Sequence, residues 1–326
     1  MAGIERHWQK LTPVSLLLLP LGVLFGVLAA LRRAMYRRRL LPSHRLSVPV
    51  IVVGNITVGG TGKTPLVIWL AGELKQAGYR PGIVTRGYRG QSRRWPLAVT
   101  PDTSPVAAGD EAVLLAQRSG CPVMAGPDRV AAAQRLVAQG CNAIVSDDGL
   151  QHYRLQRDLE IAVIDGMRRF GNGLCLPAGP LREPVSRLRE VDWRVTNGEP
   201  QGGEIGMRLV PTAIYRLDAP DRQAEAGDFD FGAVHAVAGI GNPGRFFDSL
   251  RVLGLKIRPH AFPDHHAYRA ADLEFGDHHP VLMTEKDAVK CRRFAQPHHW
   301  VVAVAAEPEA RLATAIRERL KEIQRG

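Results

Sequence analysis

A chain of 326 residues exceeds one typical hydrophobic core and fits two domains, and a hydrophobic fraction of 45% excludes a disordered chain. The formal net charge of +11 directs attention to anionic partners, which are nucleic acid, lipid headgroups and phosphorylated substrates. Four cysteines without a CxxC pair argue against a zinc or redox motif and indicate reduced thiols in a cytosolic setting.

The first predicted element is an uncharged apolar segment of 21 residues, Leu11 to Leu31. At a rise of about 1.5 Å per residue it is long enough to cross a hydrocarbon core of about 30 Å. Its prolines and glycines, and the six arginines without an acid between Arg32 and Arg45, also suit a helix lying in the membrane interface. This charge distribution favours a membrane surface over nucleic acid as partner. A plain buried helix is the alternative, and the arginines oppose a cleaved signal peptide.

The stretch GNITVGGTGKTP, residues 54–65, has the composition of a phosphate-binding loop. It lies between the β-branched run VPVIVVGN, typical of a buried parallel strand, and KTPLVIWLAGELKQAG, which has helical apolar spacing. The strict pattern GxxxxGK[ST] would place its first glycine at position 57, where this chain has Thr57, so the sequence predicts a variant loop. The alternative is a glycine-rich turn with a solvated lysine.

Each part of such a loop would have its own task in binding ATP. Backbone N–H groups freed by the glycines would point at phosphate oxygens, and the helix dipole would add favourable potential. Lys63 would reach the β and γ phosphates, and Thr64 would bind Mg²⁺. The predicted nucleotide-binding residues are Gly59, Gly60, Thr61, Gly62, Lys63 and Thr64.

Strand and helix patterns alternate after the loop, which predicts an α/β fold with a parallel sheet, helices on both faces and ligands at the carboxyl ends of the strands. AIVSDDG places Asp147 and Asp148 at such an end, where a P-loop enzyme holds Mg²⁺. Asp165, which ends IAVIDG, is the alternative metal acid. Asp110 opens a predicted helix in GDEA, so helix capping explains it as well as catalysis does.

The second half offers weaker signals. Residues 197–230 are polar and glycine-rich and indicate a linker region with short strands in IGMRLV, residues 205–210, and TAIYRL, residues 212–217. Beyond them the pattern reads strand, turn, helix, strand. GIGNPG, residues 239–244, matches GxGxxG without an acid at the ribose distance, so a tight structural turn is expected. In TEKDAVK, Lys286 and Asp287 are adjacent, which does not fit the guanine-reading element of GTPases. Histidines gather between His260 and His299, but adjacent pairs chelate zinc poorly.

With these pieces placed, the chain resembles the tetraacyldisaccharide 4′-kinases, the lipid A kinases of Gram-negative bacteria. The likeness covers nearly the full length and includes the variant loop with its threonine. It lies in an ordered series of motifs: VGNITVGGTGKTP, TRGYRG, GDEA, GPDR, SDDGLQH, LPAGPLREP, AGIGNPGRFF, FPDHHAY and TEKDAVK.

The resemblance implies transfer of the γ-phosphoryl group of ATP to the 4′-hydroxyl of a tetraacyl glucosamine disaccharide 1-phosphate, at the cytoplasmic side of the inner membrane. It implies Asp110 as general base beside His265, chosen over His266 by motif position, with Lys63 on the phosphates. The implied Mg²⁺ ligands are Thr64, Asp147, Asp148 and Glu183. The implied substrate-cleft residues are Arg86, Tyr88, Arg129, Gln151, His152 and Arg182.

The expected organisation is a membrane-associated helix with its basic flank over residues 1–45, a P-loop kinase domain over 46–200, a linker over 201–230 and a smaller α/β domain over 231–326. Two other classes of protein compete with the kinase. A membrane-associated P-loop ATPase switch usually has KGGxGKT, with a lysine where this chain has Val58. A basic lipid-binding module without catalysis would leave the ordered acids unexplained.

Overall fold

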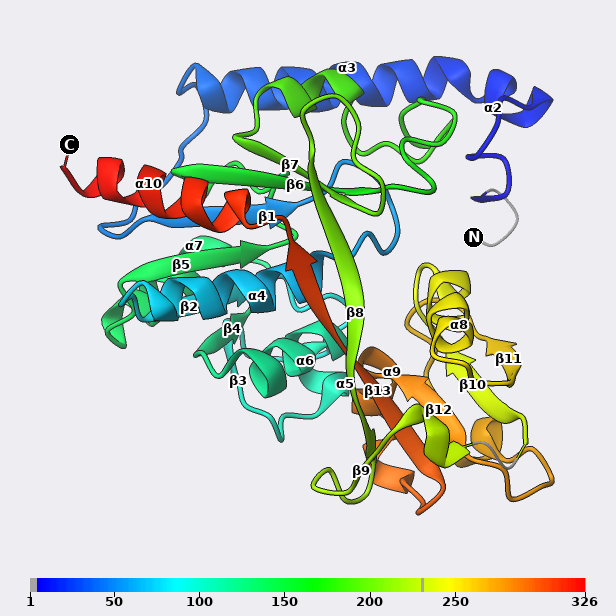
Figure 1. The fold of residues 1–326 in the computed structure, drawn as a ribbon. Helices are drawn as coiled ribbons and strands as arrows, with labels where there is room; N and C mark the ends of the chain where they lie inside the picture. Colours follow the sequence, from blue (N-terminus) through cyan, green and yellow to red (C-terminus); the bar gives the residue numbers. More distant parts are fainter. Residues whose placement is uncertain (1–4, 230–231, 326) are drawn as a thin grey trace.

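One sheet of thirteen strands runs through the molecule, whose computed structural model describes residues 5–229 and 232–325. The strand order is β11-β10-β12-β13-β8-β7-β6-β1-β5-β2-β4-β3, with β9 beside β8 (Figure 1). The strands of the larger part are β1 (Val50–Gly54), β2 (Pro81–Thr85), β3 (Leu97–Val99), β4 (Val123–Ala125), β5 (Ala143–Asp147), β6 (Leu159–Asp165) and β7 (Trp193–Asn197).

The central strands of this part are parallel and buried on both faces, as their continuous apolar sequences predict. β1 pairs in parallel with β5 and β6, whereas β3 adds an antiparallel edge to β4. Alternate residues of β1 enter two different cores: Ile51 and Val53 belong to one, and Val50 and Val52 to the other. The expected α/β sheet with helices on both faces is confirmed.

The helices of the larger part contribute to two hydrophobic cores, one on each face of the sheet. α4 (Lys63–Gln76), α6 (Asp110–Ser119) and α10 (Arg311–Arg325) contribute to the same core as Ile51, and α7 (Arg129–Ala138) contributes to the core of Val50. The short α5 (Pro105–Ala108) precedes α6. α4 begins directly after the predicted phosphate loop, and α6 begins at the predicted site residue Asp110. The amino ends of both helices therefore point at the candidate site.

The apolar segment near the amino end forms α2 (Pro13–Leu17) and α3 (Leu19–Arg37), and α3 lies along the surface of the body beside the sheet (Figure 1). Gly22 and Gly26 are buried there, and a Cβ at Gly22 would come within 2.8 Å of the Cys175 carbonyl oxygen. The opposite face is apolar and open, since Leu21, Leu24 and Leu28 are 53%, 54% and 55% exposed. The helix is therefore attached to the body along one side and uncovered along the other.

The smaller part contains β10 (Val234–Ala238), α8 (Pro243–Val252), β11 (Ile257–Ala261), β12 (Val281–Thr284), α9 (Glu285–Cys291) and β13 (His299–Pro308). Between the parts, β8 (Ile205–Arg216) and β9 (Gln223–Ala224) occupy much of the segment expected to be a linker. β8 is ordered because it pairs in parallel with β7 and antiparallel with β13. The domain boundaries stay a prediction, and the structure shows one sheet passing from part to part.

Candidate active site

The phosphate loop spans the eight residues between β1 and α4 and needs glycine at its last position. Gly62 caps α4 with φ of 95°, a left-handed conformation that residues with a Cβ rarely adopt. A Cβ there would also come within 2.7 Å of the Asn197 side-chain nitrogen. Lys63 and Thr64 open the helix directly after this turn, as the loop's function in nucleotide binding requires.

Thr57, which replaces the usual first glycine, is explained by its backbone. It is not among the residues with positive φ, and it pairs with Leu181 in an isolated bridge. The next residue, Val58, donates its N–H to the Pro180 carbonyl at 2.9 Å. Because this end of the loop is held in extended pairing against residues 180–181, a side chain at position 57 causes no strain.

Asp148 lies at the centre of a cluster of cations. Lys63 Nζ is 3.4 Å from its Oδ1, and Arg182 Nη1 donates to Oδ1 and Oδ2 at 3.1 and 2.9 Å. Arg129 Nη1 donates to the Asp148 carbonyl at 2.7 Å. Burial alone would raise the pKa of Asp148, but Lys63 and Arg182 hold it well below its ordinary value. The carboxylate is therefore ionised and fixes the lysine beside the loop.

Asp147, at the end of β5, lacks such compensation. Its Oδ2 accepts a 3.4 Å hydrogen bond from Thr85, while its Oδ1 is buried without a partner. Burial, followed by the negative charges of Glu111 and Asp148, raises the pKa of Asp147 to about 7. A buried oxygen without a donor, next to a second carboxylate, is a position suited to a divalent cation.

Glu183 lies in a buried network that supports the loop. Its oxygens accept hydrogen bonds from Gln151 Nε2, at 2.9 Å, and from the Tyr153 hydroxyl. Gln151 Nε2 also donates at 3.0 Å to the carbonyl of Asn55, the first residue of the loop. Arg33 of α3 reaches within 3.9 Å of the same carboxylate. The network connects α3 to the loop, and the metal-binding role of Glu183 stays a prediction.

Asp165, the alternative metal acid, joins the two parts of the molecule. It accepts hydrogen bonds from Arg168 Nε and Arg245 Nη2, both at 3.2 Å, and from Asn242 Nδ2 at 3.4 Å. Burial acts in the opposite direction, but Arg245, followed by Arg168, lowers the pKa of Asp165. Its oxygens are occupied by protein donors from both parts, unlike Asp147 Oδ1.

Asp110 and His265, separated by 155 residues in sequence, form a direct pair. His265 Nδ1 lies 3.0 Å from both carboxylate oxygens of Asp110, and the Tyr88 ring packs edge-on against the imidazole at 5.1 Å. Burial favours the neutral acid, yet the hydrogen bond to His265 and the charge of Lys286 lower the pKa of Asp110 to about 2. The neighbouring His266 instead contacts Asp272 at 3.0 Å.

The GIGNPG turn connects this pair to the phosphate loop. A Cβ on Gly241 would come within 2.4 Å of the Gly60 nitrogen, so the two backbones are in contact. Arg168 donates to the carbonyls of both Gly60 and Gly241. On its other side the turn accepts the His265 N–H at the Gly239 carbonyl, at 3.2 Å. The expected structural turn therefore also forms one wall of the candidate site.

Gly241→Ala is expected to displace the phosphate loop, because its new methyl group would overlap the Gly60 backbone. We expect kcat/KM for ATP to fall at least about tenfold. Gly244→Ala is the matched control, since a Cβ there meets only Asn242 Oδ1 at 3.7 Å. Equal steady-state kinetics for the two variants would show that the turn does not hold the loop.

The remaining predicted residues differ in their surroundings. Arg86 and Tyr88 are exposed. His152 is half-buried, and burial together with Arg129 lowers its pKa to about 4, so its ring is neutral. Among residues 5–229 and 232–325, no three His, Cys, Asp or Glu side chains form a group able to hold a metal. Magnesium needs only one or two carboxylates, with phosphates and water completing its shell.

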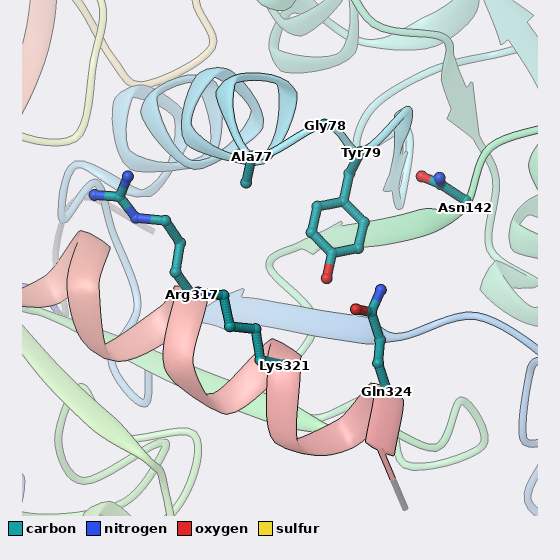
Figure 2. Close-up of a pocket in the computed structure, with 7 residues that line it drawn as sticks. All are labelled: Ala77, Gly78, Tyr79, Asn142, Arg317, Lys321 and Gln324. Atoms are coloured by element: carbon teal, nitrogen blue, oxygen red, sulfur yellow. The ribbon is translucent and has the colours of Figure 1, made fainter.

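Sequence reasoning missed four charged residues around the pair. Lys286, Lys290, Glu111 and Asp264 all lie close to Asp110 or His265. The sequence contained one indication of these residues, since each of them belongs to a motif already singled out: GDEA, FPDHHAY or TEKDAVK. In contrast, the pocket of about 360 Å³ between the far end of α4 and α10 contains no predicted site residue (Figure 2).

A phosphate loop between a buried parallel strand and a helix, with acids at neighbouring strand ends, defines a P-loop nucleotide-binding enzyme. Residues 14–321 match the family model described as LpxK, tetraacyldisaccharide-1-P 4′-kinase, and the chain belongs to that family. It is therefore a kinase by family.

The similarity extends over whole chains. The tetraacyldisaccharide 4′-kinase of Nitrosococcus oceani is 56% identical over 301 residues, covering 92% of this chain and 88% of its own. That of Alkalilimnicola ehrlichii is 56% identical over 324 residues, covering 98% and 96%. A crystal structure of LpxK from Aquifex aeolicus in complex with ATP superposes with a TM-score of 0.78 at 29% identity, covering 94% of this chain and 99% of that one.

Proposed function

We propose that this chain transfers the γ-phosphoryl group of ATP to the 4′-hydroxyl of a tetraacyl glucosamine disaccharide 1-phosphate, a step of lipid A biosynthesis. The family supports this reaction. The observation that supports particular residues as its catalytic groups is the pairing of Asp110 with His265. A switch ATPase activates water and needs no sugar-facing carboxylate. Here a carboxylate–histidine pair is connected to the phosphate loop through the GIGNPG turn.

The loop and the cations around it position the phosphates. Amides of Gly59 to Gly62 and the amino end of α4 would bind the β and γ phosphates, and Lys63 would move from Asp148 to the γ phosphate. Thr64, Asp147 and Asp148 would hold Mg²⁺, which fits the unpartnered Asp147 Oδ1. When bound, that ion neutralises the charge that develops on the phosphate oxygens.

Asp110 would accept the proton of the 4′-hydroxyl. A carboxylate with a pKa of about 2 is a weak base, but a loose phosphoryl-transfer transition state requires little proton removal until the new P–O bond is forming. His265 holds the carboxylate in place from one side, and Lys290 Nζ lies 3.8 Å away on another. Positioning therefore matters more here than base strength.

The direct test uses γ-labelled ATP and the acylated disaccharide. We expect label in the lipid product and dependence of its formation on both substrates and on Mg²⁺. Label released only as free phosphate would favour the ATPase switch. Binding of the lipid with no turnover of ATP would favour the basic lipid-binding module.

The chain would meet its lipid at the membrane surface, on the cytoplasmic side of the inner membrane. By length and composition α3 could cross a membrane. Its contacts with the body extend from Gly22 to Arg33, however, so a perpendicular span would draw Cys175 and the surrounding backbone into hydrocarbon. We infer that α3 lies in the interface, with its open leucine face in the bilayer and the arginines at the headgroups.

Replacing Leu21, Leu24 and Leu28 together by glutamine is expected to weaken liposome partitioning at least about tenfold, because three exposed apolar side chains lose their transfer free energy. Contacts of α3 with the body stay intact, so the melting temperature should not change. Val252→Gln, at a site that is 88% exposed on α8, is the control and should sediment with liposomes like the parent. Full retention of the triple variant would place the anchor elsewhere.

A further inference from the structure

A partly buried cation from the motif TEKDAVK contacts His265 on the side of the ring that faces away from Asp110. Lys286 lies in α9, which packs beside α6 (Figure 1). Its Nζ is 3.0 Å from Glu111 Oε1, 3.2 Å from Asp264 Oδ1 and 3.3 Å from His265 Nε2. Burial opposes its charge, but these carboxylates and Asp110 raise the pKa of Lys286 above its ordinary value. The group is therefore an ammonium ion.

An ammonium ion restricts what the imidazole can do. It has three N–H donors and no acceptor, so the ring nitrogen facing it, His265 Nε2, must accept. The proton of a neutral ring then resides on Nδ1, which faces both oxygens of Asp110 at 3.0 Å. Only one tautomer satisfies both sides of the ring at once.

Other charges around the ring act in opposite directions. Asp110 and Glu111 from α6 and Asp264 from the ring's own loop favour an imidazolium ion, with Asp264 Oδ1 3.7 Å from Nε2. Lys286 and Lys290 from α9 and Arg89, which donates to the His265 carbonyl at 3.1 Å, oppose it. Lys286 is the one that contacts the ring nitrogen, so it decides the balance at that atom.

We propose that Lys286 is a positioning residue that holds His265 as the neutral Nδ1–H tautomer and so keeps Asp110 the proton acceptor of the phosphoryl transfer. The proposal rests on the function assigned above to Asp110 and His265. In the reaction the O–H bond of the sugar breaks and an O–H bond forms on Asp110, while the sugar oxygen bonds to phosphorus and ADP leaves. His265 takes no proton, since Nδ1 already has one and Lys286 covers Nε2.

The first test reads the tautomer directly, without turnover. In the ¹⁵N-labelled full chain, with the ring assigned by its absence in His265→Gln, nitrogen shifts should show neutral Nδ1–H between pH 6 and 8, about the range in which an ordinary histidine titrates. In Lys286→Met the ring should become imidazolium at the lower end of that range. A wild-type ring protonated on Nε2, or an unchanged ring in the variant, would overturn the proposal.

The second test separates positioning from simple structural pairing. An imidazolium weakens Asp110 as a base, so in Lys286→Met the acid limb of kcat should move up by about one pH unit or more, while Lys286→Arg should restore it. Glu111→Gln removes the ion pair with Lys286 but keeps the lysine charge. The acid limb of kcat in this variant should therefore stay in place or move to lower pH. Equal upward shifts in Glu111→Gln and Lys286→Met would show that only the ion pair matters. If Asp110 proves dispensable, its proposed function fails, but the NMR measurement still tests the tautomer of His265 independently.

Discussion

Lys63→Ala is expected to lower kcat by at least about 10³, because the side chain supplies the charge that meets the γ phosphate in the transition state. The fold should survive, since Lys63 begins α4 and makes its ion pair with Asp148 at the site and not in the core. Turnover of labelled ATP and thermal unfolding of the same preparation measure the two effects.

Lys321→Ala is the control for the loss of a positive charge. Lys321 is exposed and lines the pocket beside the far end of α4, about 20 Å from the loop at the helical rise over 14 residues (Figure 2). Its kinetics should match the parent. If Lys63→Ala were as active as Lys321→Ala, the phosphate loop would not be part of the catalytic site.

Asp110→Asn is expected to lower kcat by at least about 10², with the KM for ATP nearly unchanged. The amide keeps the size of the side chain but cannot accept the sugar proton, and it can still contact His265. Because the pKa of Asp110 is about 2, the carboxylate of the parent is ionised throughout the neutral range, so the defect should persist at every pH from 6 to 9.

Asp272→Asn is the matched control, since it alters the other Asp–His pair of the same motif, in which Asp272 contacts His266. That variant should keep the parent's kcat. Loss of ATP binding in Asp110→Asn would instead indicate a role in the metal site, and equal kcat in the two variants would remove Asp110 from the chemistry.

Local chemistry made the nucleotide side of the site predictable. The strand, glycine loop and helix around Lys63, and the acids Asp147 and Asp148, are encoded within short windows whose geometry follows from hydrogen bonding and helix dipoles. β8 was predictable only in part, since IGMRLV and TAIYRL indicated two short strands within a linker. Pairing with β7 and β13 joins these segments into one strand of 12 residues.

The family resemblance supplied pairings that no local pattern contained. On residue chemistry alone helix capping was the stronger explanation of Asp110, and its contact with His265 is the observation that supports the proposed catalytic function. GIGNPG and TEKDAVK were predicted to serve neither dinucleotide nor guanine recognition. What the turn touches, Gly60, and what Lys286 touches, His265, lie far away in sequence and could not be inferred from it.

The sequence by itself determined the α/β class, the phosphate loop, the apolar helix with its basic flank and the acids at strand ends. Each of these features depends on patterns among residues that are close together in the sequence. Only the tertiary structure decided which face of α3 is covered, which acid lacks a donor and which charged groups flank His265. Those properties depend on contacts between residues as many as 176 positions apart in sequence, and such contacts form only when the chain folds.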